Sequence, residues 1–159
     1  MEHIVYLALG SNLGNRLLNL KTAIGNLTPQ MELKKRSYVY ETPPWGFADQ
    51  PAFLNQVVQA ETYEKPANLL KHIKRLETAL GRIPNFQNGP RLIDIDILFY
   101  DDLILDTGSL VIPHPRLHER AFVLGPLADI APDLVHPVLH KSVKEMLADI
   151  SSEDVIRVA

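Results

Sequence analysis

The chain has 159 residues, of which 46% are hydrophobic and 22% charged, so it can build one sizeable hydrophobic core. Its formal net charge of -3 and its pI near 6.0 argue against a general nucleic-acid-binding protein, which would carry a basic stripe. With no cysteine, the chain can form no disulfide and has no thiolate for catalysis or metal binding.

No apolar run approaches the length of a membrane span, and the first residues lack the pattern of a signal peptide. We therefore expect a single domain over residues 1–159 that acts in the cytoplasm on small molecules, without binding nucleic acid or a membrane.

The chain opens with a predicted strand and helix. Residues 3–9 are almost wholly apolar, which predicts a buried strand. After a turn at 10–14, apolar residues recur at helical spacing from Leu17 to Leu27, where a Thr-Pro pair ends the helix. A glycine-bearing turn between strand and helix can bind phosphate through its amides. This turn lacks the P-loop ending and the dinucleotide-binding spacing, so we interpret it as structural.

Two further strands are predicted next, with a long connection between them. Residues 31–41 predict a polar strand near a sheet edge, and residues 53–62 predict a strand in which Phe53 and Asn55 share one face. The connection, residues 42–51, holds three prolines and the only tryptophan. A connection of this length is more often functional than a short hairpin turn.

A second helix precedes the most unusual strand. Pro66 suits a first helical position and Gly81 suits the residue after the last turn. Beyond an irregular loop, residues 88–98 run from a Gly-Pro turn into alternating Ile and Asp, so that Asp94 and Asp96 share one face. Strands are depleted in Asp, and neighbouring carboxylates repel unless a cation or a proton intervenes. This pattern alone leaves open a solvated acidic face or a divalent-metal site.

The order strand, helix, strand, strand, helix, strand is the βαββαβ pattern of a ferredoxin-like split βαβ fold. We therefore predict an α+β protein with an antiparallel-dominated sheet, whose helices cover one face and leave the other for ligands or additional elements. Residues 100–112 predict a hairpin, residues 117–130 short helical segments, and residues 141–149 an amphipathic helix.

In such a sheet, Phe53 and Asn55 could face the same side as Asp94 and Asp96. An aromatic ring and an amide suit a flat heterocycle, and paired aspartates suit Mg²⁺ with phosphate oxygens. Arginines in loops or at element ends can bind phosphate; these are Arg82, Arg91, Arg116 and Arg120. Core packing of Phe53 and solvated arginines are the alternatives.

Other candidate chemistry is weaker. The pairs His114/His118 and His136/His140 have the spacing of zinc-binding helices. A proline follows the first histidine of each pair, and no cysteine completes a zinc site. Ser11 lacks the glycine pattern of a serine-hydrolase nucleophile. We expect neither chemistry.

Separated motifs along the chain resemble a single family. The motifs are Leu9–Asn15, Tyr40–Gly46, Phe53–Asn55, Gly89–Leu98, Ile112–Arg116 and Arg120–Leu127. In this order, over essentially the whole chain, they resemble the 6-hydroxymethyl-7,8-dihydropterin pyrophosphokinase family of the folate pathway. The resemblance implies extra C-terminal elements that complete a three-layer αβα arrangement, and it implies a monomer.

The resemblance also implies an activity and a set of site residues. The activity is transfer of a pyrophosphoryl group from ATP to the pterin hydroxymethyl group, releasing AMP, with two Mg²⁺ ions on Asp94 and Asp96. Arg82 and Arg91 match arginines that assist the transfer. The residues that match pterin contacts are Thr42, Pro43, Trp45, Phe53, Asn55 and Phe122. Those that match ATP contacts are Lys74, Glu77, Ile97, His114 and Arg120.

The loop at residues 83–88 departs from the family pattern. It carries no basic residue, whereas many members have Arg or Lys there, so we expect less dependence on this loop or compensation by Trp45 and Phe86. Three rival functions remain: a Mg²⁺-dependent kinase that transfers only the γ-phosphate, a non-catalytic ligand-binding domain, and a nucleic-acid-binding domain. The negative net charge disfavours the last of these.

Overall fold

The structure is a computed structural model that describes residues 2–44, 49–81 and 92–159. The helices and strands follow in chain order: β1 (His3–Ser11), α1 (Arg16–Gly25), β2 (Met31–Arg36), β3 (Tyr40–Thr42), β4 (Phe53–Thr62), α2 (Pro66–Ala79), β5 (Asp94–Tyr100), β6 (Leu105–Asp106), β7 (Val111–Ile112), the 3-10 helix η1 (Leu117–Glu119), α3 (Ala121–Ile130), α4 (Val143–Ala148) and β8 (Ile156–Arg157).

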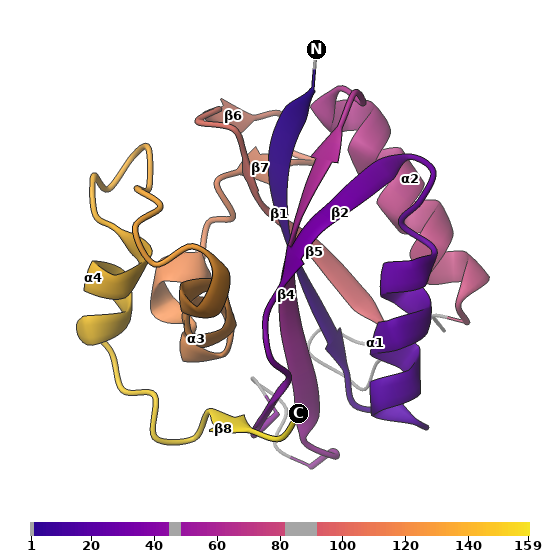
Figure 1. The fold of residues 1–159 in the computed structure, drawn as a ribbon, viewed down its shortest axis with the longest axis vertical. Helices are drawn as coiled ribbons and strands as arrows, with labels where there is room; N and C mark the ends of the chain where they lie inside the picture. Colours follow the sequence, from indigo (N-terminus) through magenta and orange to yellow (C-terminus); the bar gives the residue numbers. More distant parts are fainter. Residues whose placement is uncertain (1, 45–48, 82–91) are drawn as a thin grey trace.

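The main sheet has the strand order β5-β1-β4-β3-β8, and β2 also pairs with β4. Every strand pairing in the described part of the chain is antiparallel. Figure 1 shows α1 and α2 on one side of this sheet and α3 and α4 on the other. The predicted ferredoxin-like core, its C-terminal hairpin and helices, and the three-layer arrangement are therefore confirmed.

A hydrophobic core lies on each face of the sheet. Val5, Leu7 and Leu9 of β1 pack with residues of α1 and α2, whereas Tyr6 packs with residues of α3 and α4. Successive residues of a strand face opposite sides, so a strand buried on both faces must be apolar throughout. This explains the nearly continuous apolar run at the start of the chain.

The prediction of a single strand over residues 31–41 is wrong, because the structure has two strands there, β2 and β3. Between them, Ser37 replaces regular pairing with β4. Its amide donates to the carbonyl oxygen of Val57 at 2.8 Å, and its hydroxyl accepts from the Val57 amide at 2.9 Å. A side-chain hydroxyl thus takes the place of a backbone carbonyl. The chain then resumes pairing as β3, opposite Phe53–Asn55.

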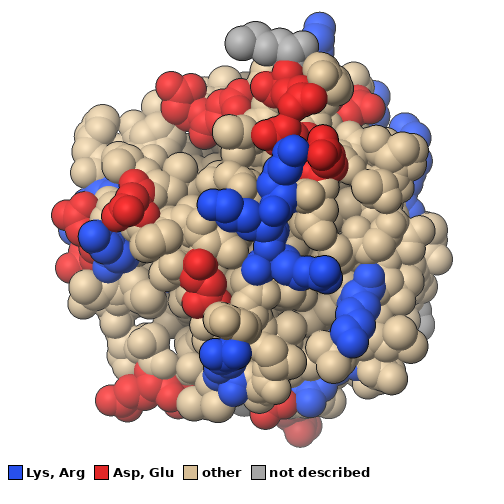
Figure 2. All heavy atoms as spheres, in the orientation of Figure 1, with Lys and Arg blue, Asp and Glu red and all other residues tan. Residues whose placement is uncertain are grey.

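Charged side chains cover β2, which pairs only with β4 in the described part of the chain. Figure 2 shows basic side chains gathered in the middle of this face, with acidic ones beside them. Lys34, Lys35 and Arg36 are exposed, and Lys34 lies 3.0 Å from a Glu32 oxygen and 3.7 Å from a Glu61 oxygen. Exposed charges on a strand discourage edge-to-edge association with another sheet. The lysine also supplies the counter-charge for the acidic groups around it.

None of the helices in the described ranges is both long enough and apolar enough to cross a membrane.

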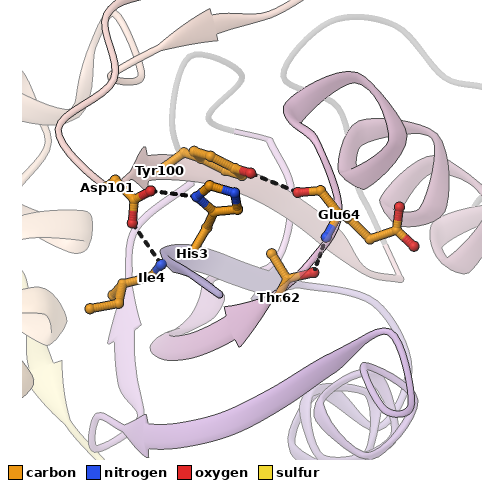
Figure 3. Close-up of polar contacts among 6 residues, drawn as sticks. All are labelled: His3, Ile4, Thr62, Glu64, Tyr100 and Asp101. Atoms are coloured by element: carbon orange, nitrogen blue, oxygen red, sulfur yellow. Dashed lines mark hydrogen bonds and ion pairs between the residues drawn. The ribbon is translucent and has the colours of Figure 1, made fainter. Parts of the chain in front are cut away.

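A polar latch ties the start of β1 to the end of β5 (Figure 3). The Asp101 carboxylate accepts the Ile4 amide at 2.8 Å and lies 2.7 Å from Nδ1 of His3. The His3 ring lies against Tyr100, with 4.8 Å between the ring centroids. Asp101 has a φ of 49°, a left-handed conformation that Asp and Asn adopt more readily than most residues. Asp101 therefore serves these contacts in two ways: its carboxylate binds His3 and the Ile4 amide, and its backbone tolerates the positive φ.

Asp101→Ala is expected to lower the free energy of unfolding by about 1–3 kcal/mol, because the Ile4 amide loses its acceptor and alanine disfavours a positive φ. Asp101→Asn keeps an oxygen acceptor and the tolerated conformation, so it should cost less. Urea denaturation measures both. Asp102→Ala, in the same turn and exposed, is the matched control. Equal effects of the alanine and asparagine substitutions at Asp101 would contradict this account.

Candidate active site

A cross-strand row on one face of the sheet brings the candidate residues together. Gly10 of β1 is directly opposite Asn55 of β4 and directly opposite Asp94 of β5. Residues directly opposite each other in antiparallel strands point to the same face. The expected common face for Asn55 and Asp94 is therefore confirmed, and this face is the one that α3 and α4 cover elsewhere.

Small residues of β1 form the floor between the polar side chains. Ala8 is opposite Asp96, and Gly10 separates Asn55 from Asp94. A Cβ atom on Gly10 would lie 3.3 Å from Oδ1 of Asn55 and 3.5 Å from Cδ1 of Phe53. Glycine inside a strand often marks the close approach of a ligand or another chain. The sequence interpretation treated Gly10 only as part of a turn and missed this role.

The Asn55 side chain has a defined orientation. Its Nδ2 donates to Oγ1 of Thr42 at 2.7 Å, and both residues are buried. The amide oxygen therefore points towards the space above Gly10. An oxygen in this position can accept hydrogen bonds from the edge of a bound heterocycle. Pro43, next to Thr42, is exposed.

The carboxylates of Asp94 and Asp96 on β5 repel each other. Burial, reinforced by the charge of Asp94, raises the pKa of Asp96 to about 7, and Glu77 adds a smaller effect in the same direction. Arg120 and Lys74 oppose this rise. A divalent cation would remove the repulsion, and paired carboxylate oxygens are donors that suit Mg²⁺. The donor set therefore fits magnesium.

A basic group, Arg120, and a neutral histidine, His114, lie near the two carboxylates. Arg120 is the residue before α3, and its guanidinium carbon is 5.6 Å from the centroid of the Phe122 ring. Burial lowers the pKa of Arg120, and Asp96 opposes this effect. Burial, with the nearby charge of Arg120, also lowers the pKa of His114 to about 4, so the imidazole is neutral near pH 7.

The orientation of His114 follows from two hydrogen bonds. Its amide donates to the carbonyl oxygen of Leu98 in β5 at 3.0 Å, and its Nδ1 accepts the Arg116 amide at 3.2 Å. The proton of the neutral ring is therefore on Nε2. The turn that follows the hairpin is thus fixed to the strand that carries the aspartates.

Lys74 and Glu77 belong to α2, which covers the opposite side of the sheet, and Ile97 faces that side (Figure 1). Glu77 of α2 is 1% exposed, and its carboxylate accepts the Ile95 amide at 2.9 Å. Lys74 lies 3.2 Å from the same carboxylate, and the Ile97 side chain is buried in the core beside α1 and α2. Ile95 and Ile97 alternate with the aspartates, so they face the opposite side. The Ile97 side chain therefore does not lie on the aspartate face, whereas the charges of Glu77 and Lys74 are near enough to shift the pKa of Asp96. The contacts of all three residues with ATP stay predictions.

Three of the predicted site residues lie outside the described residues: Trp45, Arg82 and Arg91. The same holds for the uncharged loop at 83–88. Their expected roles stay predictions.

Comparison with known proteins identifies the family. The sequence profile described as 7,8-dihydro-6-hydroxymethylpterin-pyrophosphokinase matches residues 6–132. An Aquifex aeolicus protein named 2-amino-4-hydroxy-6-hydroxymethyldihydropteridine pyrophosphokinase is 46% identical over 141 residues, covering 89% of this chain and 88% of that protein. A protein of the same name from Methylorubrum extorquens is 44% identical over 155 residues, covering 96% and 97%. The chain belongs to this pyrophosphokinase family.

Other similar proteins carry the matched region within a longer polypeptide. Folic acid synthesis protein FOL1 of Dictyostelium discoideum is 46% identical over 145 residues, which are 91% of this chain and 22% of that protein. The structure of Plasmodium falciparum HPPK-DHPS has a TM-score of 0.76 over 98% of this chain and 47% of that chain. At 20% identity, that likeness shows the fold alone. The chain spans less than half the length of either protein.

The glycine-bearing turn after β1 and the first residue of α1 hold the segment before β4 through hydrogen bonds. Nδ2 of Asn12 donates to Oε1 of Gln50 at 2.7 Å and to the carbonyl oxygen of Pro51 at 3.0 Å. Arg16 donates to the carbonyl oxygen of Ala52 at 3.0 Å and lies 2.8 Å from a Glu41 oxygen. These contacts support the structural interpretation of the turn. No periodicity or spacing in the sequence could have paired Asn12 and Arg16 with partners so distant in the chain.

Proposed function

We propose that this chain transfers a pyrophosphoryl group from ATP to the hydroxymethyl oxygen of 6-hydroxymethyl-7,8-dihydropterin, releasing AMP, in folate biosynthesis. Membership of the pyrophosphokinase family supports this assignment. The single structural observation that carries it is the row from Asn55 through Gly10 to Asp94. An amide that can read a heterocycle and a carboxylate that can hold a metal lie on either side of a floor without a side chain.

The heterocycle subsite lies beside β3 and β4. We propose that Phe53 and Phe122 contact the two faces of the pterin ring, since aromatic rings stack favourably on flat heterocycles. The Asn55 oxygen, oriented by Thr42, would accept hydrogen bonds from the pterin edge. Pro43 and Trp45 would line the same subsite.

The phosphate subsite lies beside β5. Asp94 and Asp96 would hold two Mg²⁺ ions, which when bound would supply charge neutralisation for the triphosphate and lower the pKa of the attacking hydroxyl. Arg120 and the Nε2 proton of His114 would donate to phosphate oxygens, as charged and neutral donors respectively. Arg82, Arg91 and Lys74 would add positive charge from the loop before β5 and from α2. Positioning and charge neutralisation carry most of the catalysis in reactions of this kind.

One assay tests the proposal: the protein is incubated with Mg-ATP and hydroxymethyldihydropterin, and the nucleotide product is identified. AMP formed in equal amount to pyrophosphorylated pterin supports the proposed function. ADP would indicate a kinase that transfers only the γ-phosphate. Absence of turnover in folded protein would favour a non-catalytic binding domain. Either of the last two results overturns the proposal.

A further inference from the structure

Residues 156–159 form a strap along the outer edge of β3. Arg157 is opposite Tyr40 and Ile156 is opposite Glu41 in an antiparallel pairing. Next to this pair, the Val39 amide donates to the carbonyl oxygen of Ala159 at 3.1 Å, and the Val158 amide donates to the carbonyl oxygen of Val39 at 2.9 Å. Figure 1 shows this segment leaving α4 and running back to the sheet. The family profile ends at residue 132, so the strap lies outside the matched region.

The strap matters because β3 is only three residues long. Without β8, β3 would be an edge strand of the main sheet, paired with β4 alone in the described part of the chain. The Arg157 guanidinium carbon lies 3.4 Å from the centroid of the Tyr38 ring, which is a close cation–π contact. The strap therefore adds both backbone hydrogen bonds and a side-chain contact to this end of the sheet.

A second group of contacts fixes β3 from α3. The Tyr40 hydroxyl donates to the Asp129 carboxylate, with 2.9 Å to each oxygen, and the Tyr38 amide donates to the same carboxylate at 3.3 Å. Burial, with the charge of Asp129, raises the pKa of Tyr40 to about 12, so the phenol keeps the proton that it donates. Tyr40 is therefore held by its backbone pairing with Arg157 of β8 and by the hydrogen bonds from its hydroxyl to Asp129 of α3.

The strand that these contacts hold, β3, is bonded to the Asn55 side chain through Thr42. Tyr40 is opposite Asn55, and Thr42 is opposite Phe53, so all four side chains lie on the face of the sheet that carries the candidate site. The Thr42 hydroxyl is the acceptor that orients the Asn55 amide. A displacement of β3 would therefore turn or release the group that reads the heterocycle.

We propose that the 156–159 strap, with Tyr40 and Asp129, is a positioning element that holds β3 so that Thr42 presents the Asn55 amide oxygen to the pterin. This proposal rests on the proposed function for the identity of the ligand. It assigns a role in the pterin subsite to residues that do not themselves contact the ligand.

Three variants test the proposal: removal of residues 156–159, Arg157→Ala and Tyr40→Phe. The first readout is the pair of side-chain amide resonances of Asn55 in ¹⁵N–¹H spectra of the free protein. All three variants are expected to shift these resonances. The second readout is direct binding: the Kd for hydroxymethyldihydropterin should rise about tenfold in the truncated protein, the effect of losing one good hydrogen bond. The Kd for Mg-ATP should stay within about twofold.

Two controls separate positioning from general destabilisation. Ile156→Ala removes a side chain that is 56% exposed and leaves the backbone pairing intact, so it should change neither readout. Thr42→Ser keeps the hydroxyl and should leave the Asn55 resonances near their original positions, whereas Thr42→Val should shift them as the strap variants do. If the truncated protein does not fold, Arg157→Ala and Tyr40→Phe still decide the question.

Unchanged Asn55 resonances in folded strap variants would overturn the proposal, and so would an equal loss of affinity for both ligands. Failure of the proposed function is distinguishable, because it appears as absence of AMP with the unaltered chain. The Asn55 resonances show whether the strap orients the amide, whether or not the unaltered chain forms AMP.

Discussion

Asp94→Asn and Asp96→Asn are each expected to reduce turnover by about a thousandfold, which corresponds to a loss of about 4 kcal/mol of transition-state stabilisation. Each substitution removes one charged oxygen donor from the pair on β5 and keeps the side-chain shape. Asparagine is a poor substitute because an amide oxygen carries no net charge to hold a divalent cation. The measurement is the rate of AMP formation at saturating ATP and pterin.

The folded state should tolerate both substitutions. Burial and Asp94 together raise the pKa of Asp96 to about 7, so removal of either charge relieves a repulsion in the native protein. Thermal denaturation should therefore show an unchanged or slightly higher midpoint in the absence of metal. Asp102→Asn, at an exposed turn position, should leave both turnover and stability unchanged. Retained turnover in both β5 variants would rule out the metal site.

Gly10→Val is expected to lower kcat/KM for the pterin by about a hundredfold or more, the scale of loss when reacting groups are misplaced by about 1 Å. Already at Gly10→Ala, the new Cβ would lie 3.3 Å from Oδ1 of Asn55, and valine adds two methyl groups in the same space. Valine suits a β-strand, so the strand itself should persist. Steady-state kinetics with the pterin varied at saturating Mg-ATP measure the effect.

Gly25→Ala is the matched control for this substitution. Gly25 is the last residue of α1, and a Cβ there would meet nothing within 4 Å. Alanine at this position should leave the kinetics unchanged, and it should stabilise the helix slightly because alanine loses less entropy than glycine on folding. If Gly10→Val bound and converted the pterin normally, the floor of the site would lie elsewhere.

The sequence by itself determined the elements whose residues repeat with a regular period. The Ile/Asp alternation placed Asp94 and Asp96 on one face of β5, and the apolar spacing located α1 and α2 to within one or two residues. The order of these elements was enough for the ferredoxin-like core, because few arrangements of βαββαβ bury all the apolar faces. The motifs themselves were sufficient to indicate the family.

Only the tertiary structure decided which residues meet across the sheet, since hydrogen-bond register depends on packing of the whole molecule and leaves little trace in local sequence. It put Gly10 between Asn55 and Asp94, and it joined the Glu77 carboxylate of α2 to the Ile95 amide of β5. It divided the strand predicted over residues 31–41 at Ser37. It also added β8, whose two residues are too few to show any period, to the strand that orients the Asn55 amide.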